Sequence, residues 1–150
     1  MAFVFRFQKV LEICIHEENE VKTRLAQKDG QIAAVKAEIK KFKDEYAVAL
    51  EHKAADLQAG EMMRVQMYPA YLTRLQRAWE FQEEELERLE KQRQKIFDEL
   101  MIKRRNRMTY EKMREKDEAA YKKEMLKKEQ KRLDEYGNRL KKTAGDYDDA

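Results

Sequence analysis

Residues 52–71 read HKAADLQAGEMMRVQMYPAY and interrupt a pattern that is otherwise helical along the chain. Gly60 offers a helix stop, and Pro69 suits the first turn of a new helix while it disfavours helical angles at Tyr68. The 150 residues contain only 4 Gly and 1 Pro, so turn signals are rare elsewhere. We therefore expect a single reversal, at about residues 58–68, between two long helices.

Before this bend, apolar residues recur at alternating steps of three and four. Polar residues occupy the same row at Glu18 and Lys28. A 3.5-residue repeat held for about six heptads predicts a coiled-coil seam. The apolar members are Phe7, Leu11, Cys14, Val21, Leu25, Ile32, Val35, Ile39, Phe42, Tyr46 and Ala49.

A second row follows the bend and consists of Leu72, Leu75, Trp79, Gln82, Leu86, Leu89, Arg93, Ile96 and Leu100. Two such rows joined by one bend predict an all-α fold, an antiparallel coiled-coil hairpin. We expect one domain over residues 1–142, with helix one at about 3–57 and helix two at about 69–142. The last residues, TAGDYDDA at 143–150, are interpreted as a disordered acidic tail.

The second row weakens over the basic residues 103–114 and returns late in helix two. Its late members are Tyr121, Met125, Leu133, Tyr136 and Leu140. Because helix two is the longer helix, these residues would extend past the end of helix one. Such an apolar row either contacts a partner or belongs to a frayed coil.

The opening residues, MAFVFRFQKVLEIC at 1–14, carry three Phe but do not read as a signal peptide. Arg6, Lys9 and Glu12 interrupt the apolar run, which is also far shorter than the roughly 20 residues of a membrane span. The single Cys14 is compatible with a reducing compartment. We expect a cytoplasmic protein without direct membrane insertion.

Residues for catalysis are not apparent in the sequence. It has no phosphate-binding Gly loop, no CxxC and no HExxH. His16 and Glu20 share a helix face, but two ligands are too few for a metal site. We therefore expect no enzymatic activity, no cofactor and no bound metal.

Charge is distributed unevenly although the net charge is only +3. Residues 80–99 carry four basic and eight acidic side chains, whereas residues 103–142 carry sixteen basic and eight acidic ones. KRRNR at 103–107 lacks a nucleic-acid-binding module around it, so no nucleic-acid partner is expected. A solvated face and an acidic protein partner remain open for this run.

Both ends of the chain resemble the FliJ family of bacterial flagellar export proteins. The similar segments are FRFQKVLEI at 5–13, the pattern E-x-x-V-x-x-x-L-A over residues 18–26, and QKRLDEYGNRL at 130–140. The resemblance implies a two-helix coil similar to the central stalk of rotary ATPases. It implies a non-catalytic coupling role at the flagellar base, peripheral to the inner membrane. The implied partners are the export ATPase ring, the cytoplasmic domain of the export gate membrane protein, and export chaperones.

The resemblance also suggests two contact surfaces. The positions that match the family's gate-contacting surface are Val35, Ile39, Phe42, Tyr46, Tyr71, Leu75, Ala78 and Gln82. The same spacing suits a seam, which is the favoured role of Ile39 and Leu75, whereas large rings are better contact candidates. Contacts with the ATPase ring are expected from Phe3, Phe5, Lys127, Lys128, Lys131 and Arg132, although the two Phe could instead pack on helix two.

Two other functions fit the same pattern. One is a stalk-type coiled-coil subunit of a rotary ATPase, and the other is a generic coiled-coil scaffold.

Overall fold

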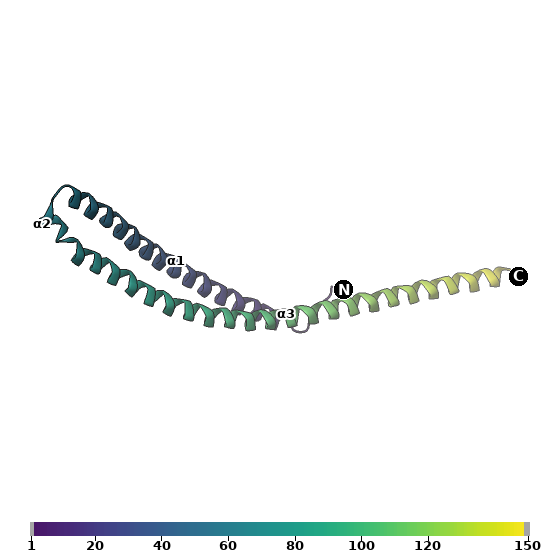
Figure 1. Ribbon diagram of the computed structural model, residues 1–150. Helices are drawn as coiled ribbons and strands as arrows, with labels where there is room; N and C mark the ends of the chain where they lie inside the picture. The colour runs from purple at the N-terminus through teal and green to yellow at the C-terminus, as the bar shows by residue number, and fades with distance from the viewer. Residues whose placement is uncertain (1, 149–150) are drawn as a thin grey trace. The chain divides into compact units, whose positions relative to one another are not determined.

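A computed structural model describes residues 2–148, which form three helices (Figure 1). They are α1 (Gln8–Gln58), the short α2 (Met62–Val65) and α3 (Tyr68–Asp148), and no strand occurs among the described residues. The predicted all-α helical hairpin is confirmed. The chain divides into two compact units, a hairpin unit (Glu17–Ile102) and a terminal unit (Met1–His16 with Lys103–Ala150), which we describe separately.

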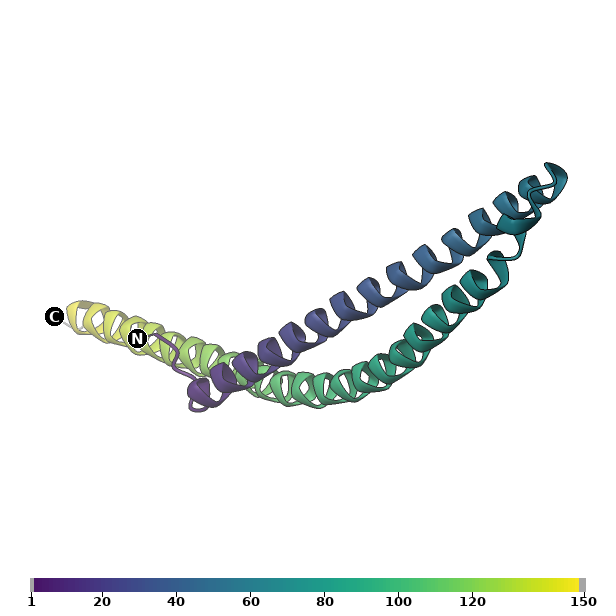
Figure 2. The same cartoon turned by 90° about the vertical axis from the view of Figure 1, so that its left-hand side faces the viewer.

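In the hairpin unit, α1 and α3 lie side by side and run antiparallel (Figures 1 and 2). Ion pairs join Arg24 to Glu99 at 2.6 Å and Lys43 to Glu83 at 3.3 Å, so later residues of α1 meet earlier residues of α3. The buried apolar side chains are all members of the two predicted rows, which confirms the seam. They are Val21, Ile32, Ile39, Ala49, Leu72, Leu75, Leu89 and Leu100.

The polar members of the seam find polar partners. Glu18 is only 2% exposed, and the Nζ atom of Lys22 lies 3.2 Å from its carboxylate. Lys28 donates a hydrogen bond of 2.8 Å from Nζ to the side chain of Gln92 on α3. Pairing of this kind is what allows a polar group to remain in a buried row.

The bend is built by a glycine-terminated helix end. The backbone N–H of Glu61 donates to the carbonyl of Asp56 at 2.9 Å, and that of Gly60 donates to the carbonyl of Leu57 at 3.2 Å. This pair of bonds is the Schellman motif, which needs a left-handed residue at the position of Gly60. Gly60 has a φ of 74°, so the predicted helix stop is confirmed. Pro69 lies in the first turn of α3, where its missing N–H leaves no bond unmade.

The terminal unit begins with a non-helical segment, so helix one starts at Gln8 and not near residue 3. In a helix, Phe5 would point away from Phe3 and Phe7, because residues two apart lie on opposite sides. The non-helical segment brings all three rings into packing. Phe5 is buried against Phe7 at 6.0 Å, Phe7 packs on Tyr110 at 6.1 Å, and Phe3 packs on Tyr121 at 5.5 Å between ring centroids.

Helix α3 also extends further than the sequence suggested. It continues to Asp148, so residues 143–148 are helical and not a disordered tail, while residues 149–150 lie outside the described residues. Thr143 lies within this last stretch. Its Oγ1 donates a hydrogen bond of 2.9 Å to the carbonyl of Arg139, a bond typical of a helical threonine. Gly145 lies inside the helix and does not end it.

No side chain between residues 103 and 145 is buried. The large apolar side chains exposed over the last part of α3 are Met125, Leu126, Leu133, Tyr136 and Leu140. None of the helices in residues 2–148 combines the length and apolar character that crossing a bilayer requires.

Candidate functional site

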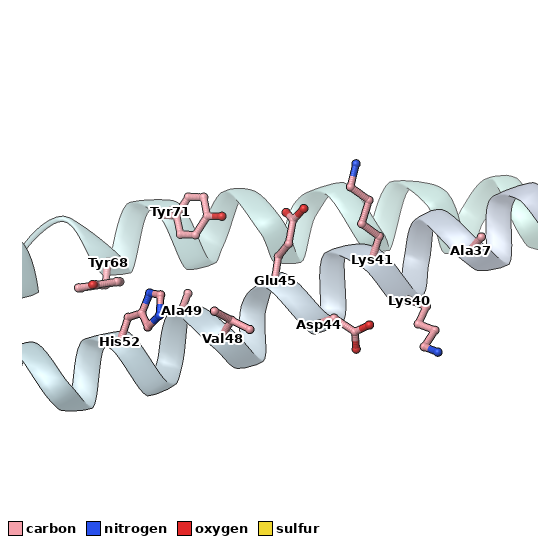
Figure 3. Close-up of a pocket in the computed structure, with 10 residues that line it drawn as sticks. All are labelled: Ala37, Lys40, Lys41, Asp44, Glu45, Val48, Ala49, His52, Tyr68 and Tyr71. Carbon is pink, nitrogen blue, oxygen red and sulfur yellow. The ribbon is translucent and has the colours of Figure 1, made fainter.

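A groove lies in the hairpin unit close to the bend, and we call it the bend groove. It has a volume of about 650 Å³. Tyr68 and Tyr71 come from α3 and face Val48, Ala49 and His52 on α1 (Figure 3). The remaining lining residues are Ala37, Lys40, Lys41, Asp44 and Glu45, so charges of both signs border an apolar floor.

Tyr68 is fixed in the groove by a hydrogen bond across the bend. Its hydroxyl donates to Oδ2 of Asp56 at 2.6 Å. This bond raises the pKa of Tyr68 above its ordinary value, and desolvation and the negative charge of Asp56 act in the same direction, against a smaller opposing effect of Arg64. The ring is therefore held between the end of α1 and the start of α3.

The predicted gate-contact residues divide into seven that are buried or half-buried and one that is exposed. Ile39 and Leu75 are buried, as a packing role requires. The half-buried members are Val35, Phe42, Tyr46, Ala78 and Gln82. Tyr71 alone is exposed, at 42%, and it also lines the bend groove.

Tyr46 shows how a large ring is accommodated between the two helices. Its ring packs edge to face with that of Trp79, with centroids 5.1 Å apart and an interplanar angle of 79°. The sequence favoured Tyr46 as a contact because a large ring is awkward in a two-stranded seam. The pairing with Trp79 supplies the space for it, and edge-to-face packing of this kind is favourable.

The predicted ring-contact residues lie in the terminal unit and fall into two groups. Phe5 is buried, and Phe3 is half-buried against Tyr121. The four cations Lys127, Lys128, Lys131 and Arg132 are all exposed on α3. Lys128 pairs with Glu124 at 3.9 Å and Arg132 with Glu129 at 3.4 Å, both with neighbours on the same helix. Exposed pairs of this kind are weak and leave the cations accessible.

Residues 3–145 match the family model described as the flagellar FliJ protein. The chain belongs to the FliJ family. The match covers almost the whole sequence and makes the chain a protein related to flagellar export. No curated protein and no solved structure matches it.

In this FliJ-family chain, the other residues considered for chemistry are dispersed. Residues 2–148 contain no group of three or more His, Cys, Asp or Glu side chains that could hold a metal ion. In the run KRRNR, Arg104 and Arg105 are exposed, while Arg107 pairs with Glu111 at 2.7 Å. Cys14 is buried in the apolar row, as expected of a packed side chain.

Sequence reasoning missed three features of the hairpin unit of this FliJ-family chain. One is the bond between Asp56 and Tyr68, since neither residue belongs to the apolar rows. Another is the pairing of Trp79 with Tyr46, which needs the register of the two helices. The third is a set of arginines around the start of α3, of which Arg74 and Arg77 could have been noticed by their spacing of three residues.

Proposed function

We propose that the protein is a non-catalytic component of the flagellar export apparatus that couples the export ATPase ring to the cytoplasmic domain of the export gate. It would work in the cytoplasm at the flagellar base, peripheral to the inner membrane, and would also escort export chaperones. Membership of the FliJ family supports the setting. The observation that carries the proposal is that exposed candidate contact residues occur in both units, Tyr71 in one and the four cations of α3 in the other.

The gate contact is assigned to the bend groove of the hairpin unit. Of the eight predicted gate residues, Tyr71 is the one whose side chain is exposed, while the others are buried or half-buried. Tyrosine is a common anchor in protein interfaces because its ring offers a large, rigid surface. Val48 and His52, which face the tyrosines across the groove, extend the same surface onto α1.

The ring contact is assigned to the basic face of α3 that carries Lys127, Lys128, Lys131 and Arg132. Phe5 is less suited to such a contact because its ring is already buried. Individual exposed ion pairs contribute only about 0–1 kcal/mol, so binding through this face would be collective and sensitive to salt.

The gate contact is tested by titrating the full chain into the purified cytoplasmic domain of the cognate gate protein. Tyr71→Ala is expected to weaken binding at least about tenfold, the effect of removing an interface anchor. Tyr136→Ala removes an exposed tyrosine from the terminal unit and should leave the affinity unchanged. Unchanged binding by Tyr71→Ala would reject the assignment to the bend groove.

The ring contact is tested by stimulation of the purified export ATPase at low salt. Reversing Lys127, Lys128, Lys131 and Arg132 to Glu is expected to abolish stimulation. The matched control reverses four other exposed cations of the terminal unit, Arg105, Lys112, Lys116 and Lys123. Equal loss in both variants would mean that net charge matters and not this face. If the wild-type chain neither binds nor stimulates the ATPase, the coupling role fails.

A further inference from the structure

Two further hollows adjoin each other at the start of α3, and together we call them the arginine trough. The first, of about 570 Å³, is lined by Arg64, Met67, Tyr68, Ala70, Tyr71 and Arg74. The second, of about 510 Å³, is lined by Pro69, Ala70, Thr73, Arg74 and Arg77. Arg74 and Ala70 line both, so the two hollows are neighbours on the surface at the start of α3. Three cations line the trough, and none of its lining residues is acidic.

The three arginines of the trough differ from the other arginines of the hairpin unit. Arg24 and Arg93 pair with carboxylates on the opposite helix, and Arg88 pairs with Glu85 on its own helix. Within residues 2–148, no ion pair or hydrogen bond engages the guanidinium of Arg64, Arg74 or Arg77. In a chain with 33 basic and 30 acidic residues, this group of unpaired cations leaves a local positive charge.

The floor of the trough is apolar and partly rigid. Tyr68 is held by its bond to Asp56, so that carboxylate is already engaged by the phenol. Beside it, Met67 and Tyr71 are exposed large apolar side chains. Arginine, tyrosine and methionine are enriched at the centres of protein interfaces, and the planar guanidinium matches the two oxygens of a carboxylate.

We propose that the arginine trough binds an acidic segment of a protein partner. An apolar side chain of that segment covers Tyr68 and Tyr71, and the carboxylates on either side of it reach the arginines. The trough shares Tyr68 and Tyr71 with the bend groove, to which the gate contact is assigned, but its three arginines belong to neither the groove nor the predicted gate-contact residues. The inference does not require the coupling role proposed above, because it concerns the chemistry of the bound segment and not which protein carries it.

Nucleic acid and anionic lipid are the other ligands that cations attract. Both bind largely through many phosphate contacts, and the trough offers only three arginines over an apolar floor. A protein segment uses both parts of the surface, because its carboxylates meet the arginines and its apolar side chain covers the tyrosines. We therefore favour the acidic protein segment.

The test selects random 12-residue peptides displayed on phage against the full-length wild-type chain. Enriched peptides are expected to carry carboxylates on both sides of an aromatic or aliphatic residue. A synthetic peptide of the enriched sequence, labelled with fluorescein, is then titrated with the full chain. Arg74→Glu/Arg77→Glu is expected to weaken its binding at least tenfold. Arg104→Glu/Arg105→Glu reverses two exposed arginines outside the trough and should bind as the wild type does, with circular dichroism confirming the helical content of both variants.

The inference is overturned if enriched peptides lack acidic residues, or if their binding survives reversal of Arg74 and Arg77. It is also overturned if a 12-nucleotide oligothymidine or vesicles of phosphatidylglycerol bind the wild type through these arginines while no acidic peptide is enriched. Since this assay contains no flagellar protein, its failure leaves the gate and ATPase experiments unaffected. Failure of those experiments likewise leaves the peptide result standing.

Discussion

The hairpin unit and the terminal unit use similar sequence patterns with different results. In the hairpin unit, heptad rows on α1 and α3 face each other, and eight apolar side chains and Glu18 become buried. In the terminal unit, the buried residues are Phe5, Leu11 and Cys14, all from the first sixteen positions. The part of α3 in that unit contributes no buried side chain up to residue 145.

The difference shows that an apolar row forms a core only where a second row covers it. Leu133 and Leu140 are spaced as seam residues are, yet both are more than half exposed. Leu75 and Leu89 have the same chemistry and are buried because α1 lies against them. The hairpin unit therefore holds most of the buried apolar side chains, and the part of α3 in the terminal unit carries exposed apolar ones.

The largest expected effect comes from truncating one leucine in each unit. Leu75→Ala removes a side chain that is 5% exposed and should lower the free energy of unfolding by about 2–4 kcal/mol. Leu133→Ala removes one that is 55% exposed and should cost less than about 0.5 kcal/mol. Urea denaturation followed by circular dichroism measures both. Similar losses would mean that the row around Leu133 is covered in solution, for example by self-association.

A somewhat smaller effect is expected from the aromatic packing that holds the start of the chain. Phe5→Ala should cost about 1.5–3 kcal/mol of local stability, since the ring is buried. Val4→Ala, one position earlier, alters a side chain that is 82% exposed and serves as the control. Hydrogen exchange should show lost protection over residues 8–16 and unchanged protection over the hairpin unit. Faster exchange throughout both units would show that they unfold together.

The seam of the hairpin unit could be predicted from the sequence because a heptad repeat is a local and redundant signal. The bend could also be predicted from a local signal, because a left-handed residue at a helix end is usually glycine and Gly60 occupies that position. The start of helix one was predicted too early. The packing of Phe5 on Phe7 depends on contacts that spacing alone does not contain.

The candidate site was harder to predict than the fold. The spacing of Ile39, Leu75 and their neighbours fits both a seam and an interface, and only the burial of each side chain separates the two. The arginine trough involves Arg64 before α3 and Arg77 within it, so it depends on how the chain turns between them. A sequence pattern predicts which residues share one face of one helix. It does not predict which residues on the two sides of a turn lie close together.

A third prediction compares an aromatic pair from each unit by double-mutant cycles. Tyr46 and Trp79 meet edge to face between two helices that are fixed by the seam, so replacing each with Leu should reveal a coupling of about 0.5–1.5 kcal/mol. Phe3 and Tyr121 form a pair at similar separation, but Phe3 lies in a non-helical end. Its coupling should be smaller because that end is easily released. An equal coupling would show that the start of the chain is as firmly held as the seam.

The smallest effect is expected at Tyr68, which closes the hairpin unit at the bend. Its pKa is raised above 10.0 in the folded chain because Asp56 accepts its proton in a hydrogen bond, so folding favours the protonated phenol. The resulting stability is fully present below pH 10 and is lost as the pH rises through the raised pKa. Tyr68→Phe should therefore be less stable than wild type at about pH 8, and the difference should shrink at about pH 11. Tyr136→Phe, an exposed tyrosine of the terminal unit, should follow the wild type at both pH values in urea denaturation. If the stability difference between Tyr68→Phe and the wild type stays constant between these pH values, the prediction is wrong. The hydrogen bond to Asp56 would then not account for the difference.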